Sequence, residues 1–335
     1  MQPIPPHDDK IALHQLQHQA VRDLAWCCFS APMMNELPGT SITILPFDNH
    51  SWWPWLHALD QDPQKLLDHL SQIKSTRLGI YYEALWHFYF SHHPDWELLH
   101  HNLQIDRNGI TLGAFDFLCR KGDEYWHIET AVKFYLSNAA NPLAAHDWKF
   151  WVGPEGKDRL DLKLNHLRQH QLPLHQTDEA KLQLNQHYPQ VKTWQTGLCM
   201  QGYLFSPSHL QHQPAFSNAQ HGRGTWWHLG EFLQGALNSA DQRWLVLERQ
   251  HWLSPAQRTG EDELLTTEQL AEKLLREITE TKRPLLIAAM KKKLLPINSK
   301  NRREIWMESA RTFIVADDWL DHPVRPGNAA PSRKT

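Results

Sequence analysis

Residues 110–136 read ITLGAFDFLCRKGDEYWHIETAVKFYL and predict two strands joined by a tight turn at Gly122-Asp123. A Gly-Asp pair between two apolar runs is typical of a two-residue β-hairpin. With the turn centred between these residues, Asp116 lies directly opposite Glu129, with Cβ atoms about 4.5–5.5 Å apart. Like charges so placed destabilise a hairpin unless a cation lies between them. The hairpin therefore predicts a divalent metal held by two carboxylates.

Strand alternation gives this hairpin a polar face and an apolar face. The polar face carries both acids, and two small residues, Ala114 and Ala131, leave room beside them for a ligand. We expect the other face to be core; it comprises Phe115, Phe117, Cys119, Trp126, Ile128 and Val132. The alternative is a solvated surface hairpin that carries two unrelated acids.

A third acid, Glu83, lies in the middle of LGIYYEALWHFYF, an apolar stretch over residues 78–90 that predicts a buried helix. A carboxylate there is unfavourable unless it is paired or bound to a metal. Mg²⁺ (or Mn²⁺) favours carboxylate oxygens, water and substrate phosphate as ligands. A lysine nearby, such as Lys133 on the polar face, would stabilise charge that develops on a phosphate. The residues predict metal-assisted phosphodiester hydrolysis.

Composition limits the partners and the compartment. The chain has 335 residues and a formal net charge of −3, which argues against an overall electrostatic fit to nucleic acid. A nucleic-acid surface must then be a local patch, and the strongest basic stretch contains Lys291, Lys292, Arg302 and Arg303. A solubilising segment is the alternative for that stretch. No apolar run approaches the roughly 18 residues that span a membrane, and four cysteines without a disulfide-like spacing favour the cytoplasm.

Hydrophobic periodicity predicts a mixed α/β fold with a partly antiparallel sheet. The expected helices cover residues 11–30, 77–90, 158–172 and 266–280, and the expected strands cover 98–106, 197–205, 243–248, 284–290 and 311–316, in addition to the hairpin. Gly222-Arg223-Gly224, ahead of two tryptophans, predicts a turn.

The order of these elements and acids resembles the PD-(D/E)XK nuclease superfamily. Glu83 lies on a helix, Asp116 on one strand, and Glu129 with Lys133 on the next, within an αβββαβ order. The chain also resembles a bacterial family of unknown function, numbered 1853, that is placed in that superfamily. The segments behind this likeness include RLGIYYEALWHFY, FDFLCRKGDEYWHIETAVKFYL and GPEGKDRLDLKLNHLRQHQL.

The resemblance implies a restriction-endonuclease-like core that cleaves DNA or RNA with Mg²⁺ or Mn²⁺. Asp116 and Glu129 would hold the metal and Glu83 would assist it. The superfamily places its lysine two residues after the second acid, where this chain has Ala131, so Lys133 or Lys163 would take that role. Substrate contacts would come from Lys163, His166, His170 and Gln171 on the following helix. The alternative is a fold that has lost catalysis and binds nucleic acid or a protein partner.

The spacing of His166 and His170 also suits zinc, but no glutamate follows the first histidine in the HExxH manner and no third ligand is evident. The resemblance divides the chain into a helical extension over residues 1–74, a nuclease-like core over 75–206 and an α/β extension over 207–320 that may share the same sheet. The Pro-, Gly- and Lys/Arg-containing residues 321–335 predict a disordered tail.

Overall fold

A computed structural model describes residues 13–45, 52–235, 242–296 and 302–320, so the tail predicted for 321–335 lies outside the described residues. The described strands form one 11-stranded mixed sheet, which confirms the mixed α/β prediction. Its main order is β2-β3-β4-β6-β7-β11-β10-β8, and β1, β5 and β9 pair with β6, β4 and β11. The strands are β1 (Thr43–Leu45), β2 (Glu97–Arg107), β3 (Ile110–Lys121), β4 (Glu124–Ser137), β5 (Trp151–Val152), β6 (Gln195–Pro207), β7 (Gly222–His228), β8 (Arg243–Leu247), β9 (Gln257–Arg258), β10 (Leu285–Pro296) and β11 (Arg302–Val315).

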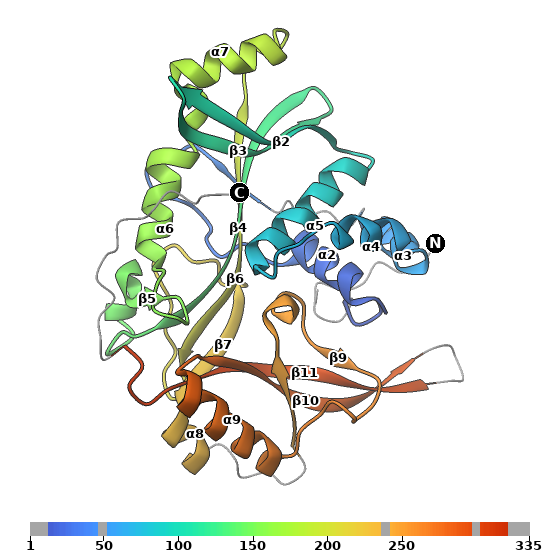
Figure 1. The fold of residues 1–335 in the computed structure, drawn as a ribbon, viewed down its shortest axis with the longest axis vertical. Coiled ribbons are helices and arrows are strands. Elements are labelled where there is room, and N and C mark those ends of the chain that lie inside the picture. Colours follow the sequence, from blue (N-terminus) through green and yellow to red (C-terminus); the bar gives the residue numbers. More distant parts are fainter. Residues whose placement is uncertain (1–12, 46–51, 236–241, 297–301, 321–335) are drawn as a thin grey trace.

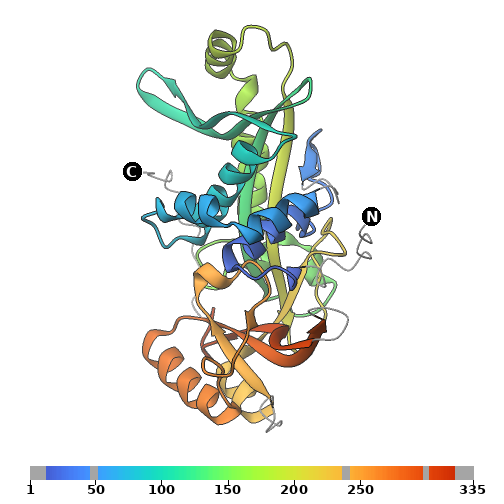
Figure 2. The ribbon, with the colours of Figure 1, turned by 90° about the vertical axis from the view of Figure 1, so that its right-hand side faces the viewer.

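Helices cover both faces of the upper sheet in Figure 1, with α2 to α5 on one side and α6 on the other. The helices are α2 (Gln19–Phe29), α3 (Trp53–Gln61), α4 (Gln64–Ser71), α5 (Leu78–His92), α6 (Leu160–His166), α7 (Asp178–His187), α8 (Leu229–Gly235) and α9 (Thr267–Thr281). A π-turn over Leu167–Gln171 continues α6. In the turned view the N-terminal helices lie in front of the central strands (Figure 2). No helix in the described part of the chain is long and apolar enough to cross a membrane.

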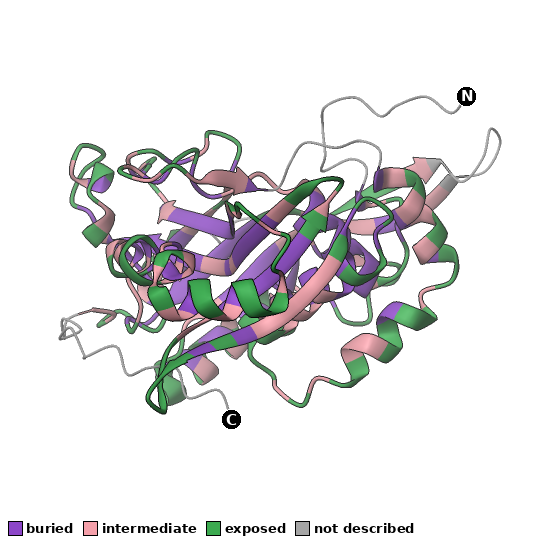
Figure 3. Cartoon of the chain, turned by 90° about the horizontal axis from the view of Figure 1, so that it is seen from above, coloured by how far each residue is buried: buried purple, intermediate pink, exposed green. Residues whose placement is uncertain are grey.

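Helix α5 is the centre of the larger core. Its aromatic side chains are buried on most sides, as its composition predicts: Tyr82, Trp86, Phe88, Tyr89 and Phe90. They pack with α2 and with the α5-facing residues of β3 and β4. The opposite face of β4 packs under α6, where Leu160, Leu164 and Leu167 meet Ala131 and Tyr135. Seen from above, buried residues run along the central strands between these layers (Figure 3).

The order α5-β2-β3-β4-α6-β6 carries the predicted sequence of one helix, three strands, a helix and a strand, interrupted by short elements and α7. Beyond β6 the sheet continues without a break, because β7 pairs parallel to both β6 and β11. Residues after 206 therefore extend the same sheet, with α8 and α9 packed on its lower part (Figure 1).

Two sequence predictions are corrected. Gly222-Arg223-Gly224 is not a turn but the start of strand β7. A Cβ on Gly222 would lie 2.5 Å from the Gly202 carbonyl oxygen, and a Cβ on Gly224 would lie 2.4 Å from the Phe205 ring. The glycines are needed because β7 runs very close to β6. Phe115 is the second correction and is described with the site.

Candidate functional site

The predicted hairpin register is correct up to the rung before the two acids. Gly122 has φ +58°, as a two-residue hairpin turn requires, and the ladder runs from Lys121 opposite Glu124 to Phe117 opposite Ile128. At the next rung the backbone pairing stops. From there β3 continues only with β2, while β4 continues with β6. Asp116 and Glu129 therefore lie where the two strands separate.

At this point the two carboxylates accept the backbone N–H groups that a continued strand pairing would use. The Glu129 Oε1 atom accepts the Asp116 backbone N–H at 3.4 Å, and the Asp116 Oδ2 atom accepts the Thr130 backbone N–H at 3.0 Å. The Thr130 hydroxyl donates to the same Asp116 oxygen at 3.3 Å. Each acid thus bonds to the opposite strand. We call Asp116, Glu129 and Thr130 the fork.

Both strands beside the fork change face at the rung of Asp116. On β3, Phe117 packs toward α5, whereas Phe115 joins the cluster on the opposite side and contacts the His127 ring, with centroids 4.6 Å apart. The prediction that Phe115 shares the face of Phe117 is therefore wrong. On β2, Asn102 lies between the partners of Phe117 and Phe115 and has φ +55°. Asn tolerates this left-handed backbone better than most residues.

Glu129 is fully buried and both its oxygens accept hydrogen bonds. His127 Nε2–H donates to Oε1 at 2.8 Å, and the Gln171 amide donates to Oε2 at 2.6 Å. Burial lowers the pKa of His127 to about 4, so the ring is a neutral donor at pH 7. The π-turn at the end of α6 places Gln171 here, and such turns are frequent at functional sites.

Of the two candidate lysines, Lys163 is connected to Glu129 by hydrogen bonds through Gln171. Its Nζ atom donates to the Gln171 Oε1 atom at 2.9 Å, which links it to Glu129 through one side chain. Burial, and then the charge of Lys133, lower the pKa of Lys163, while the charges of Glu129 and Asp116 oppose that shift.

Lys133 lies on the predicted face of β4, but its ammonium is paired with Asp158 at 2.6 Å. The Tyr135 hydroxyl donates to the same Asp158 oxygen. Ala131, at the motif position of the lysine, is buried in the core under α6. A lysine at 131 would have to displace apolar contacts, whereas Lys163 approaches from the helix above.

Glu83, on α5, forms an ion pair with His101 on β2. Its carboxylate accepts a hydrogen bond from His101 Nε2 at 2.9 Å, and the side chain is 19% exposed. Among the described residues, no group of three or more histidines, cysteines and acids is arranged to hold a metal ion. Glu83 therefore does not join Asp116 and Glu129 in a three-residue ligand set.

The other predicted substrate residues are spread over the surface. His166 and His170 are exposed on α6 and its π-turn, with ring centroids 5.2 Å apart. Lys291 and Lys292 are exposed on β10, where Lys292 pairs with Glu304 at 3.2 Å. Arg302 and Arg303 begin β11, and the Arg302 side chain lies outside the described part. Strands β6 and β7 separate the β10–β11 hairpin from β4 in the sheet, so the structure does not bring the basic stretch to the fork.

Sequence reasoning missed three residues that hold the site together: His127, Thr130 and Asp158. Only His127 carried a signal, because it shares the strand face of Glu129 two residues away. Thr130 acts through its backbone N–H as well as its hydroxyl, which no side-chain pattern reveals. Asp158 precedes α6 and reaches Lys133 only through the tertiary fold.

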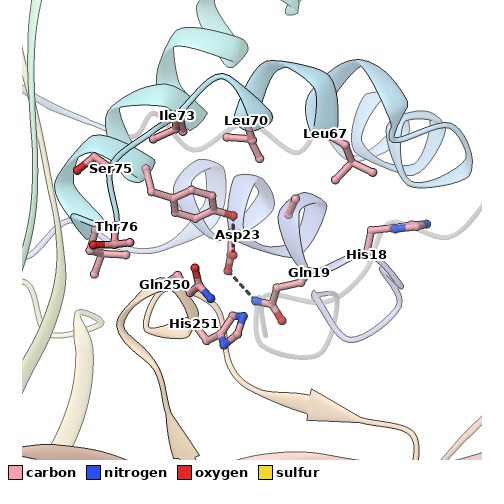
Figure 4. A pocket seen from close by; sticks show the side chains of 13 residues that line it. His18, Gln19, Asp23, Leu67, Leu70, Ile73, Ser75, Thr76, Gln250 and His251 are labelled. Atoms are coloured by element: carbon pink, nitrogen blue, oxygen red, sulfur yellow. Dashed lines mark hydrogen bonds between the residues drawn. The ribbon is translucent and has the colours of Figure 1, made fainter.

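A separate buried acid lies beside a cavity of about 520 Å³ between α2, α4 and the turn at residues 249–251 (Figure 4). Asp23 accepts bonds from the Ser254 N–H and hydroxyl, the Tyr81 hydroxyl and the Gln19 amide. Burial raises the pKa of Asp23 despite these donors. The bonds join α2 to α5 and to the C-terminal part of the sheet, which accounts for the acid as a structural link.

Comparison with known proteins identifies one family. A family model described as a domain of unknown function (DUF1853) matches residues 22–315. No curated protein and no solved structure matches the chain. The match includes the fork, α6 and the whole C-terminal part of the sheet up to β11.

Proposed function

The chain belongs to the DUF1853 family, and we propose that it is a metal-dependent phosphodiesterase that cleaves DNA or RNA at the fork. One observation carries the proposal: where the strands separate, the Glu129 carboxylate bonds to the Asp116 N–H, the Asp116 carboxylate bonds to Thr130, and Lys163 lies one side chain from Glu129. Two acids in one such network are unfavourable without a cation. The resemblance to PD-(D/E)XK nucleases in the order of acids and elements supports the same reading.

The donor set at the fork fits Mg²⁺ or Mn²⁺ in its chemistry. It supplies carboxylate oxygens, and Mg²⁺ sites commonly use one or two carboxylates together with waters and substrate phosphate. Asp116 and Glu129 would hold the ion, without Glu83 as a third ligand. When bound, the metal would polarise the scissile phosphate and lower the pKa of a water molecule.

The remaining residues of the site hold the two acids in position and offset negative charge on the substrate. His127 fixes one oxygen of Glu129 and Thr130 fixes one oxygen of Asp116, so the two acids are held before any ligand arrives. Lys163 supplies a cation for negative charge that develops on a phosphate. Asp158 holds the Lys133 ammonium, which leaves Lys163 as the lysine of the reaction.

The proposal is tested by cleavage assays with Mg²⁺ or Mn²⁺ on single- and double-stranded DNA and RNA. We expect Asp116→Asn and Glu129→Gln each to reduce cleavage on the order of 100-fold or more. Glu124→Gln, an exposed acid on the same hairpin, is the matched control and should cleave as the wild type does. Equal cleavage by the wild type and all three variants would mean that the activity comes from a contaminating nuclease.

A non-catalytic nucleic-acid-binding protein is the second candidate. It is favoured by Ala131 at the motif position and by Glu129, whose two oxygens already accept bonds from His127 and Gln171. This candidate predicts salt-sensitive binding that survives Asp116→Asn, together with no metal-dependent cleavage in the wild type.

A further inference from the structure

A second cavity, of about 640 Å³, opens on the α5 side of the sheet. It lies between α4, the loop at residues 72–77, the first turns of α5 and strand β2. We call it the histidine cavity, because His69, His87 and His101 line it together with Lys74, Arg77 and Asn102. Its volume is in the range of pockets that hold small ligands.

The histidine cavity reaches the fork through Asn102. On β2 this residue lies between the partners of Phe117 and Phe115, which are the two chain neighbours of Asp116 on β3. The Asp116 carboxylate bonds to the Thr130 hydroxyl. On β4, Ile128 packs on the α5 side and Ala131 packs under α6, so alternation points the Thr130 side chain to the α5 side. The Asp116 oxygen that accepts from the Thr130 hydroxyl therefore borders the side of the sheet on which the cavity opens.

The cavity presents a series of aromatic rings. The His87 ring lies 4.6 Å from the His101 ring and 4.9 Å from the His69 ring, measured between centroids. His69 Nε2 lies 3.1 Å from the Ala84 carbonyl oxygen, which can only accept, so this nitrogen carries the proton. The His87 Nδ1 atom, 3.3 Å from the same nitrogen, therefore presents a lone pair to it. Glu83 holds His101 in place.

The His69 and His87 rings are uncharged at neutral pH. Burial lowers the pKa of His87 to about 4, and burial also lowers the pKa of His69. The Asn102 Oδ1 atom is buried and has no hydrogen-bond partner within the described part of the chain. The interior thus offers the neutral rings of His69 and His87, one buried acceptor and the Glu83 carboxylate, which together suit a planar group that carries hydrogen-bond donors.

The rim of the cavity is positive. Lys74 and Arg77 are both exposed, and neither forms an ion pair with another described residue. An unpaired guanidinium and an ammonium on either side of a loop suit phosphate oxygens. The rings inside the cavity suit the base of a nucleotide, and the cations at the rim suit its phosphate.

We infer that the histidine cavity binds one nucleotide of a single-stranded nucleic acid, with its base against the histidine rings and its phosphates at Lys74 and Arg77. The inference rests on the proposed function, since it places the neighbouring phosphodiester at Asp116. A base that enters a cavity is neither paired nor stacked on its neighbours, so the preferred substrate is single-stranded.

Binding is measured by fluorescence anisotropy with a labelled oligothymidylate of about 12 nucleotides, using the full chain in EDTA so that cleavage plays no part. We expect the double variant Lys74→Gln/Arg77→Gln to bind at least about tenfold more weakly. The slope of the logarithm of its binding constant against the logarithm of salt concentration should be smaller in magnitude by about 1.4, since each single-strand phosphate contact contributes about 0.7. His87→Ala should weaken binding without changing that slope.

The matched control is Lys273→Gln/Arg276→Gln on α9, at the opposite end of the molecule (Figure 1), which should bind as the wild type does. A duplex of the same length should bind the wild type at least about tenfold more weakly than the single strand. The inference is overturned if the wild type does not bind the single strand, if the two double variants bind alike, or if the duplex binds equally well. A wild type that binds as expected but never cleaves contradicts the proposed function alone.

Discussion

Asp116 is the residue on which the site depends, because it accepts bonds from β4 while its own N–H bonds to Glu129. Its position opposite Glu129 follows from the Gly122-Asp123 turn, and the observed ladder confirms that register up to Phe117. The direction of the carboxylate could not be predicted, since alternation assumes an unbroken strand and β3 changes face at this residue. The same change placed Phe115 on the unexpected side.

Asn102 gives a test of this local geometry. Its φ of +55° disfavours residues with a Cβ that lack a compensating local hydrogen bond. We expect Asn102→Ala to lower the free energy of unfolding by about 1 kcal/mol, whereas Asn102→Gly should change it much less, because glycine adopts positive φ readily. Urea denaturation measures both. Equal losses would show that the side chain, rather than the backbone conformation, matters for stability.

At the scale of elements, the fork exists because β4 loses one of its two partner strands there. It leaves β3 after Ile128 and remains paired with β6 through Leu136. Helix α5 and strands β2, β3, β4, β6, β8, β10 and β11 were predictable from apolar runs, but β7 was predicted as a turn. The π-turn was not predictable, and neither were α3, α4 and α7, because their polar or irregular sequences carry little helical pattern. Lys163 and Gln171 were named from the sequence, yet their connection to Glu129 depends on that π-turn.

The β4–β6 contact makes a sharp prediction at Gly202. Its φ is +139°, and a Cβ there would lie 1.7 Å from the Lys133 carbonyl oxygen. We expect Gly202→Ala to lower the free energy of unfolding by at least about 3 kcal/mol, because backbone atoms on β4 would have to move. Chemical denaturation or the soluble yield reports the loss.

Gly79 is the control for that substitution. It lies in the first turn of α5, and a Cβ there would meet no atom within 4 Å. Gly79→Ala should raise the free energy of unfolding by roughly 0.5–1 kcal/mol, since alanine favours the helix. A Gly202→Ala protein as stable as the wild type would contradict the described closeness of β4 and β6.

At the scale of the molecule, one sheet joins the fork to the C-terminal elements, and the family match spans both parts. The fold class could be predicted from the sequence because long apolar strands and a well-formed α9 dominate it. The position of the basic stretch could not, since it depends on the order of strands. Lys291 and Lys292 are on the far side of β7 and β11 from β4. A sequence shows charge clusters but not how far they lie from a site.

Isothermal titration calorimetry with Mn²⁺ tests the central claim, that the acids of the fork form a metal site. We predict that the wild type and the Glu124→Gln control bind Mn²⁺ with the same affinity. Asp116→Asn/Glu129→Gln, which removes both charges and keeps the side-chain shapes, should lose that binding. The account is contradicted if the wild type binds no Mn²⁺, or if the double variant binds it as tightly as the wild type does.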